Sequence, residues 1–194
     1  MITTTTTTTT EAWKRPLLHV YAASGAAKVG TFKLSSGGTS DFYIDGRVVT
    51  TRPDGLRAIV AAMQAVIRER NLLPAGTNLI GPAVSGIPIA AALSLALDVP
   101  YIIDRGAAKQ HGMGKRFEGT FSDNPACLVV DDLLTTGGAV LKSAEGLREI
   151  GKTVAHAVIV VDREEGGREN LARAGVAAHT LISRAEMKAY LAKP

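Results

Sequence analysis

The sequence predicts an α/β protein built on a parallel sheet with helices on both faces. Apolar runs typical of strands alternate with amphipathic, helix-length segments through most of the 194 residues, which is the pattern of such a sheet. One run, Val154 to Val161, is apolar almost without a break, as expected for a strand that is covered on both faces. A chain of this length fits one domain with a sizeable core.

The individual elements follow from the spacing of apolar residues. The clearest helix runs from Pro53 to Asn71, where apolar residues recur every three or four positions between arginines. A strand ending at Ile80 and a break at Gly81-Pro82 precede a second helix, from about Ile87 to Leu97. A third helix is expected after Gly137-Gly138, reaching about Ile150. The remaining strands are expected at Val99 to Ile103, Leu128 to Asp131, Val154 to Val161 and Val176 to Ile182.

The N-terminal part has a different character. Thr3 to Thr10 form a low-complexity tract, which we interpret as a tail outside the fold, followed by a short helical stretch near Trp13 to Ala23. Short strands at Val29 to Leu34 and Phe42 to Asp45 are expected to form a small cap, or hood, over one end of the sheet. The predicted organisation is therefore a tail and helix over residues 1–28, then one domain over 29–194 with hood elements near 29–50.

Composition excludes several classes of protein. No apolar run approaches the length of a membrane span, and the N-terminus lacks the features of a secretion signal. A single cysteine, Cys127, rules out an internal disulfide and lies in an apolar run, so we expect a core residue and a cytoplasmic protein. The net charge of +4 without a run of lysines and arginines suits small phosphates and gives no positive sign of a nucleic-acid or membrane partner.

The most informative segment runs from Cys127 to Val140. An apolar strand delivers two adjacent carboxylates, Asp131 and Asp132, to its C-terminal end, where ligands bind open α/β sheets. The turn that follows, Thr135 to Gly138, is rich in threonine and glycine and opens into a helix. Such a turn presents free N–H groups and the positive end of the helix dipole, which suits a phosphate. An acidic strand end with an ordinary helix cap is the alternative, but the whole segment favours a site.

A second segment is basic and rich in glycine. Its cationic and imidazole side chains are Arg105, Lys109, His111, Lys115 and Arg116, interrupted by Gly106, Gly112 and Gly114. Glycines allow movement, and the cations could stabilise charge on a phosphate leaving group while the closed loop excludes water. A solvated basic loop is the alternative interpretation.

Together these residues resemble the type I phosphoribosyltransferases, which use phosphoribosyl pyrophosphate (PRPP) and Mg²⁺. The resemblance implies that family's fold, with a small N-terminal hood. It implies that Asp131 and Asp132 engage the ribose hydroxyls, directly or through water and metal. It places the 5′-phosphate in the turn. The PRPP-binding residues implied in this segment are Asp131, Asp132, Leu133, Leu134, Thr135, Thr136, Gly137, Gly138 and Ala139.

Three further stretches resemble the orotate phosphoribosyltransferase branch of that family. They are Phe32 to Gly37 with Ser40 and Tyr43 to Asp45, Asp104 to Gly112 running on to Gly119, and Val161 to Gly167. The first resembles the N-terminal signature of that branch. The second resembles a mobile catalytic loop, here near 104–119, which implies PRPP-binding roles for Arg105, Lys109 and His111. The resemblance implies catalytic roles for Lys109 and His111, together with Asp131 and Asp132. The third implies that Arg163, with Thr135, contacts orotate.

The resemblance also implies a specific reaction, a metal ion and an oligomeric state. Orotate and PRPP would give orotidine 5′-phosphate and pyrophosphate in pyrimidine biosynthesis. Mg²⁺ would be held mainly by PRPP, with Asp131 and Asp132 reaching it through water. The loop of the neighbouring subunit would complete each site, so a homodimer with shared active sites is expected. Gly81 to Gly86 would form the pyrophosphate loop.

Departures from the family pattern leave the base open. Ser35, Gly106 and Ser85 stand where lysines occur in the family, so cations expected to face the substrates are missing. The chain could be an orotate enzyme or a paralogue that uses another base. A non-catalytic PRPP-binding regulator is a third possibility, but the segment before the first signature is too short for a helix-turn-helix module. His19, His156 and His179 are scattered along the sequence without metal-ligand spacing, and each is expected to be structural or exposed.

Overall fold

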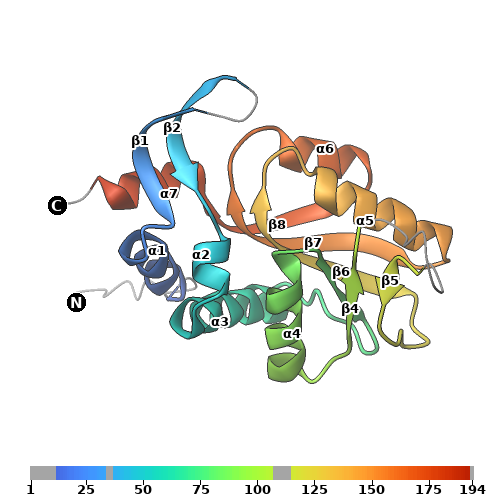
Figure 1. Ribbon diagram of the computed structural model, residues 1–194. Helices are drawn as coiled ribbons and strands as arrows, with labels where there is room; N and C mark the ends of the chain where they lie inside the picture. Colours follow the sequence, from blue (N-terminus) through green and yellow to red (C-terminus); the bar gives the residue numbers. More distant parts are fainter. Residues whose placement is uncertain (1–11, 34–36, 107–114, 193–194) are drawn as a thin grey trace, which may run out of the picture.

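The computed structural model describes residues 12–33, 37–106 and 115–192. Its centre is a six-stranded sheet in the order β5-β4-β3-β6-β7-β8, shown in Figure 1. The pairs β4–β3, β3–β6, β6–β7 and β7–β8 are parallel, and only the short edge strand β5 runs antiparallel. The predicted α/β class with a parallel sheet is therefore confirmed.

The bounds of the elements are as follows. The sheet strands are β3 (Asn78–Pro82), β4 (Tyr101–Asp104), β5 (Phe117–Glu118), β6 (Ala126–Leu134), β7 (Thr153–Asp162) and β8 (Ala177–Ser183). A separate hairpin consists of β1 (Ala27–Lys33) and β2 (Thr39–Ile44). The helices are α1 (Lys14–Ala23), α2 (Arg47–Thr50), α3 (Pro53–Glu69), α4 (Gly86–Leu97), α5 (Gly138–Glu149), α6 (Gly167–Arg173) and α7 (Arg184–Leu191).

The two faces of the sheet have separate cores, because side chains alternate along a strand. Leu128 and Val130 of β6 pack with apolar residues of α1, α3, α4 and α7 on one face. Cys127 and Val129 of the same strand pack with α5 and α6 on the other. Helices thus cover both faces, as predicted, and β6 is buried along most of its length.

Most predicted elements match within a few residues, but one boundary was wrong. The strand expected to end at Ile80 begins at Asn78 and continues through Gly81 and Pro82, which pair with Ile103 and Asp104 of β4. Gly81 is needed there because a Cβ would lie 2.7 Å from the Gly86 carbonyl oxygen of α4. Gly81 and Pro82 therefore belong to the strand, and the glycine allows its end to pack closely against α4. The sequence prediction also omitted α2, α6, α7 and β5.

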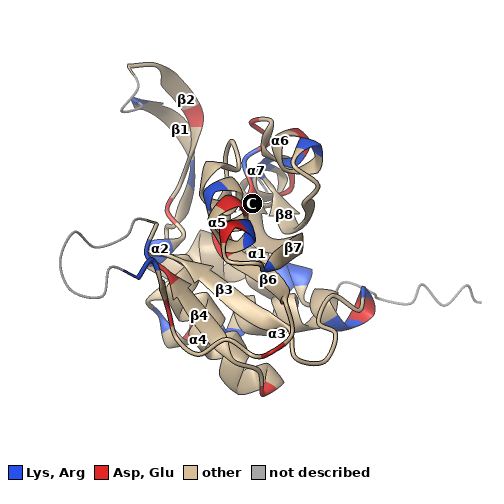
Figure 2. Cartoon of the chain, turned by 90° about the vertical axis from the view of Figure 1, so that its right-hand side faces the viewer, with Lys and Arg blue, Asp and Glu red and all other residues tan. Residues whose placement is uncertain are grey.

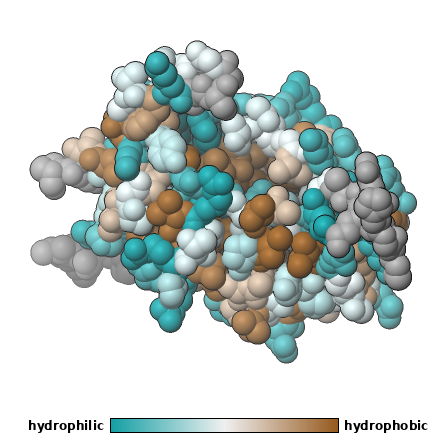
Figure 3. Space-filling view, viewed as in Figure 1, coloured by the Kyte–Doolittle hydropathy of each residue, from teal (hydrophilic) through white to brown (hydrophobic). Residues whose placement is uncertain are grey.

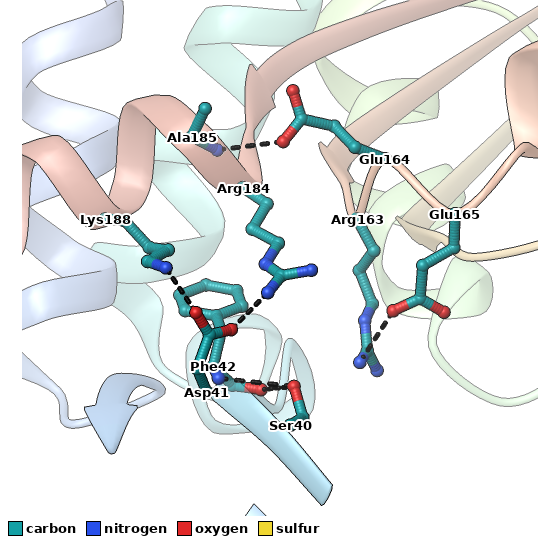
Figure 4. A network of polar contacts seen from close by, with 9 residues as sticks. All are labelled: Ser40, Asp41, Phe42, Arg163, Glu164, Glu165, Arg184, Ala185 and Lys188. Atoms are coloured by element: carbon teal, nitrogen blue, oxygen red, sulfur yellow. Dashed lines mark hydrogen bonds and ion pairs between the residues drawn. The ribbon is translucent and has the colours of Figure 1, made fainter. Parts of the chain in front are cut away.

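The hairpin β1–β2 stands beside the sheet, on the same side of the molecule as α1 and α7 (Figure 1). Polar contacts hold it there: Asp41 of β2 accepts from Arg184, and from Lys188 Nζ at 2.6 Å, both in α7 (Figure 4). In α1, Leu17 and Tyr21 are fully buried in the same core. The predicted division at residue 28 therefore runs through a packed region.

None of the helices in the described ranges is long and apolar enough to cross a membrane. Acidic and basic residues alternate over α5 and α6 in Figure 2. The sequence places Lys142, Glu145, Arg148 and Glu149 in the first of these helices.

Candidate active site

A cavity of about 440 Å³ lies at the C-terminal edge of the sheet, where β3, β4 and β6 end and α5 begins. Ligands bind open α/β sheets at this edge. Its lining residues are Pro82, Ala83, Asp104, Gly106, Arg116, Leu133, Leu134, Thr135, Thr136, Gly137, Gly138, Ala139, Val140, Lys142 and Ser143. Every predicted residue from Leu133 to Ala139 is among them, and their role in binding PRPP stays a prediction.

The turn between β6 and α5 is held in place by α6. The Asn170 side chain donates to the Thr136 carbonyl at 2.8 Å. Gly167 lies so close that a Cβ there would be 2.6 Å from the Thr135 carbonyl oxygen. Gly137 has a φ of 84°, a conformation that favours glycine. No side chain in the described ranges caps the N-terminus of α5, so its first N–H groups and the helix dipole remain available to an anion.

The two acids of β6 lie directly before this turn. Asp131 and Asp132 are 7% and 9% exposed, and the Asp132 N–H donates to Asp131 Oδ1 at 2.9 Å. Burial raises the pKa of both carboxyl groups, and the charge of Asp132 raises that of Asp131 further. Gly46 lies against Asp132, because a Cβ there would be 2.2 Å from Asp132 Oδ2. Neither acid lines the cavity described above. A nearby cation or hydroxyl donor would lower the free-energy cost of ionising each buried carboxyl group.

Both ends of the predicted mobile loop are joined by an ion pair. Arg116 donates from Nε to Asp104 Oδ1 at 2.8 Å and from a terminal nitrogen to Oδ2 at 2.9 Å. Ser143 of α5 donates to Asp104 Oδ2 at 2.6 Å, and Arg116 also donates to the Lys142 carbonyl at 2.8 Å. Burial alone would raise the pKa of Asp104, but Arg116 and Ser143 outweigh it and the pKa is lowered. The base of the loop is thereby fixed to the helix that follows the phosphate turn.

The loop residues themselves divide into two groups. Arg105 does not line the cavity, and its side chain pairs with Glu118 at 3.3 Å. Its predicted role in binding PRPP stays a prediction, and in the described conformation the guanidinium is paired with a carboxylate on β5. Lys109 and His111, predicted as catalytic, lie outside the described residues, as does Ser35.

Arg163 extends from the end of β7, beside the hood contact of Arg184 (Figure 4). Its guanidinium pairs with Glu165 at 2.9 Å, and its backbone N–H donates to the Leu134 carbonyl at 2.9 Å. The buried Nε has no hydrogen-bond partner among the described residues. Arg163 is absent from the cavity lining, although its backbone is tied to the strand end that carries Thr135. Its contact with orotate stays a prediction.

The predicted pyrophosphate loop connects β3 to α4. Pro82 and Ala83 line the cavity, and the Ala83 N–H donates to the Asp104 carbonyl at 2.7 Å. The Ala83–Val84 peptide is cis. The Ser85 hydroxyl favours the ionised form of Asp132 and so acts against the burial that raises its pKa.

Sequence reasoning missed several residues of this region. Gly46, Lys142, Ser143 and Asn170 were not singled out, and Asp104 was quoted only as part of a motif. Lys142 could have been found, because it follows Gly138 by one helical turn and shares its face. The others come from elements whose packing no local pattern specifies.

The other candidates behave as structural residues. Cys127 is buried, as predicted, and burial raises the pKa of its thiol to about 11. His156 and His179 lie on the paired strands β7 and β8 with ring nitrogens 3.2 Å apart. Burial and neighbouring Arg70 lower the pKa of His179 to about 4. Among the described residues, no group of three His, Cys, Asp or Glu could hold a metal.

Comparison with known proteins identifies the class to which this fold and cavity belong. The phosphoribosyl transferase domain family matches residues 51–176. The orotate phosphoribosyltransferase of Halobacterium salinarum is 42% identical over 171 residues, 88% of this chain and 94% of the relative. That of Pyrococcus abyssi is 38% identical over 169 residues, covering 87% and 92%.

A solved structure agrees with these relatives. The crystal structure of orotate phosphoribosyltransferase from Aeropyrum pernix superposes with a TM-score of 0.78 at 33% identity, covering 91% of this chain and 99% of that one. The chain belongs to the phosphoribosyltransferase family, and its relatives place it among the orotate phosphoribosyltransferases.

Proposed function

We propose that this protein transfers the phosphoribosyl group of PRPP to orotate, giving orotidine 5′-phosphate and pyrophosphate. The observation that carries the proposal is the cavity formed by an uncapped, glycine-containing turn directly after two buried carboxylates. That arrangement matches a ligand with a phosphate at one end and a hydroxylated, metal-bound sugar beside it. The orotate-specific relatives support the choice of base.

In the proposed complex the residues of β6 and its turn bind the two parts of PRPP. The 5′-phosphate accepts hydrogen bonds from the N–H groups of Thr135 to Ala139, at the positive end of α5. Asp131 and Asp132 accept from the ribose hydroxyls. Because both carboxylates are nearly buried, these hydrogen bonds hold the sugar in one orientation.

The acids also fit a Mg²⁺ ion. Hard divalent cations prefer carboxylate and phosphate oxygens, and a cation nearby would relieve the repulsion between Asp131 and Asp132. Among the described residues, no group of three His, Cys, Asp or Glu side chains could hold an ion. In the proposed complex PRPP itself supplies most of the ligands. When bound, Mg²⁺ neutralises charge on the pyrophosphate leaving group.

The reaction exchanges one bond at the anomeric carbon for another. A ring nitrogen of orotate forms a bond to that carbon, and the bond to pyrophosphate breaks with its electron pair leaving on oxygen. Arg163 would hold an orotate carboxylate or carbonyl with its planar set of donors. In the described conformation the Arg163 guanidinium is paired with Glu165. On binding, the carboxylate of orotate would take the place of the Glu165 carboxylate.

Lys109, His111 and Arg105 are proposed to reach the pyrophosphate when the loop closes over the site. For Arg105 this requires release of Glu118, an exposed ion pair at 3.3 Å, which costs little because such pairs contribute about 0–1 kcal/mol. The stabilisation of developing charge by these cations is the main contribution expected of the loop.

We also propose a homodimer, with α4 in the interface. This helix is apolar on nearly all sides, and Leu95 on its outer face is 89% exposed. Brown, apolar residues appear over α4 in Figure 3. A helix that is apolar all round is normally buried, so a second copy would cover it. A reducing, cytoplasmic setting suits the single buried cysteine.

The direct test measures loss of orotate absorbance and release of pyrophosphate with PRPP and Mg²⁺. Arg163→Ala is expected to raise KM for orotate by about 10-fold or more through loss of a charge-assisted contact, while KM for PRPP stays nearly unchanged. Arg68→Ala, an exposed position at the far end of α3, serves as the control. PRPP binding without consumption of orotate would overturn the assignment of the base.

A further inference from the structure

Among the described residues that line the cavity, two have cationic side chains, and one of these two is available to a ligand. Arg116 and Lys142 are the lysine and arginine residues among the lining residues. Arg116 is occupied, because both carboxylate oxygens of Asp104 and the Lys142 carbonyl accept from its guanidinium. For Lys142, the described residues provide no ion pair and no hydrogen bond to the ammonium group, and the residue is exposed.

Helix geometry directs Lys142 toward the phosphate turn. It follows Gly138, the first residue of α5, by four positions and therefore lies on the same helix face one turn away. Side chains on a helix tilt toward its N-terminus. The long lysine side chain thus extends along the cavity wall toward Thr135 to Ala139, the residues that surround the N-terminus of α5.

The position of Lys142 is also fixed by its backbone. Its carbonyl accepts from Arg116 at 2.8 Å, and the next residue, Ser143, donates to Asp104 at 2.6 Å. This second turn of α5 is therefore tied to the end of β4. A cation mounted on such an anchored turn loses less freedom on binding an anion than one on a free loop.

We propose that Lys142 is a further substrate-binding residue, whose ammonium group binds the 5′-phosphate held by the turn. The inference deepens the function proposed above and rests on it. Lys142 would supply a full positive charge beside the turn, where Arg116 is the other lysine or arginine among the described lining residues and is already paired with Asp104. The two negative charges of a phosphate monoester would then meet the α5 dipole and one full cation.

The test compares Lys142→Ala and Lys142→Arg with wild type. Lys142→Ala is expected to raise KM for PRPP by about 5- to 20-fold, in the range of a charge-assisted contact to a partly exposed group. The KM for orotate and kcat should change by less than about 2-fold, and Lys142→Arg should restore most of the PRPP affinity. Arg68→Ala controls for the loss of one positive charge elsewhere.

Direct binding identifies which phosphate is held. Calorimetry with ribose 5-phosphate should show weaker binding by Lys142→Ala, whereas binding of pyrophosphate with Mg²⁺ should be unchanged. The reverse pattern, or an unchanged KM for PRPP in Lys142→Ala, would overturn the role of Lys142 while wild-type turnover of orotate still supported the proposed function. A wild-type protein that binds PRPP and responds to Lys142→Ala without consuming orotate would overturn only the base.

Discussion

At the scale of single residues, the site holds two carboxyl groups that are nearly buried. Asp131 and Asp132 are adjacent in sequence and nearly buried, so ionising both costs free energy that ligand hydroxyls and a cation would offset. Asp132 is confined by Gly46, whose missing side chain leaves room for the carboxylate. The arrangement gives up stability in the free protein for binding of a hydroxylated, metal-bound ligand.

The cost of ionising two buried carboxyl groups predicts that Asp131→Asn stabilises the free protein, by an amount that depends on pH. The pKa of Asp131 is raised by burial and by Asp132, so the folded state retains a proton that the unfolded state loses above about pH 4. Stability of the free wild-type protein should therefore fall as the pH rises through the folded pKa. Asp131→Asn cannot ionise, so its advantage should grow from pH 5 to pH 9, reaching about 1–2 kcal/mol.

Thermal unfolding of both proteins at the two pH values measures this difference. Equal differences in Tm at pH 5 and pH 9 would contradict the assignment of a raised pKa.

At the scale of elements, three segments meet at the second turn of α5. The end of β4 supplies Asp104, the start of β5 lies beside Arg116, and α5 supplies Ser143 and the Lys142 carbonyl. Arg116 also lies over Gly146 of α5, where a Cβ would be 2.3 Å from its guanidinium, and over the ring of Phe117 at 5.0 Å. These contacts fix the base of the loop that carries Lys109 and His111.

Removing the Arg116 side chain should destabilise the protein more than removing an ordinary surface arginine. Arg116→Ala leaves the Asp104 side chain, only 2% exposed, without its charged partner, and we expect a loss of about 2–4 kcal/mol in unfolding free energy. The double variant Asp104→Asn with Arg116→Ala should lose less than Arg116→Ala alone, since no buried charge remains. Urea denaturation measures the unfolding free energy of Arg116→Ala, Asp104→Asn and the double variant. If the loss in the double variant equalled the sum of the losses in the two single variants, coupling between the residues would be excluded.

At the scale of the whole molecule, α7 ties the hood and the N-terminal helix to the sheet. Lys188 and Arg184 of α7 bind Asp41 of the hood (Figure 4), and Glu186 binds Lys14 of α1 at 2.9 Å. Glu186 also completes a capping box with Ser183. One short C-terminal helix therefore positions both N-terminal elements. The exposed, apolar side of α4 is left for the proposed second subunit.

The dimer makes its own prediction. Leu95→Glu places a charge on the outer face of α4 and should shift the protein toward monomer, because an unpaired charge is costly in an apolar interface. Ile150→Glu, at a half-exposed apolar position directly after α5, is the control. Sedimentation velocity measures the oligomeric state. A dimer that is unaffected by Leu95→Glu would exclude α4 from the interface.

Local sequence patterns determined the strand–helix alternation, the amphipathic helix at Pro53, the burial of Cys127 and the phosphate-type turn after Asp131-Asp132. These features depend on residues close together in the chain, so periodicity and turn chemistry suffice. Resemblance added the class of reaction and the expected roles of Arg163, Lys109 and His111.

Only the tertiary structure decided which distant residues meet. It placed Gly46 against Asp132, Arg116 on Asp104, His179 beside His156, and Lys142 in the same cavity as Ala83. It also showed Arg105 and Arg163 paired with neighbouring glutamates. Such pairings depend on strand order and helix placement, which the chain settles by burying two separate cores on the faces of one sheet.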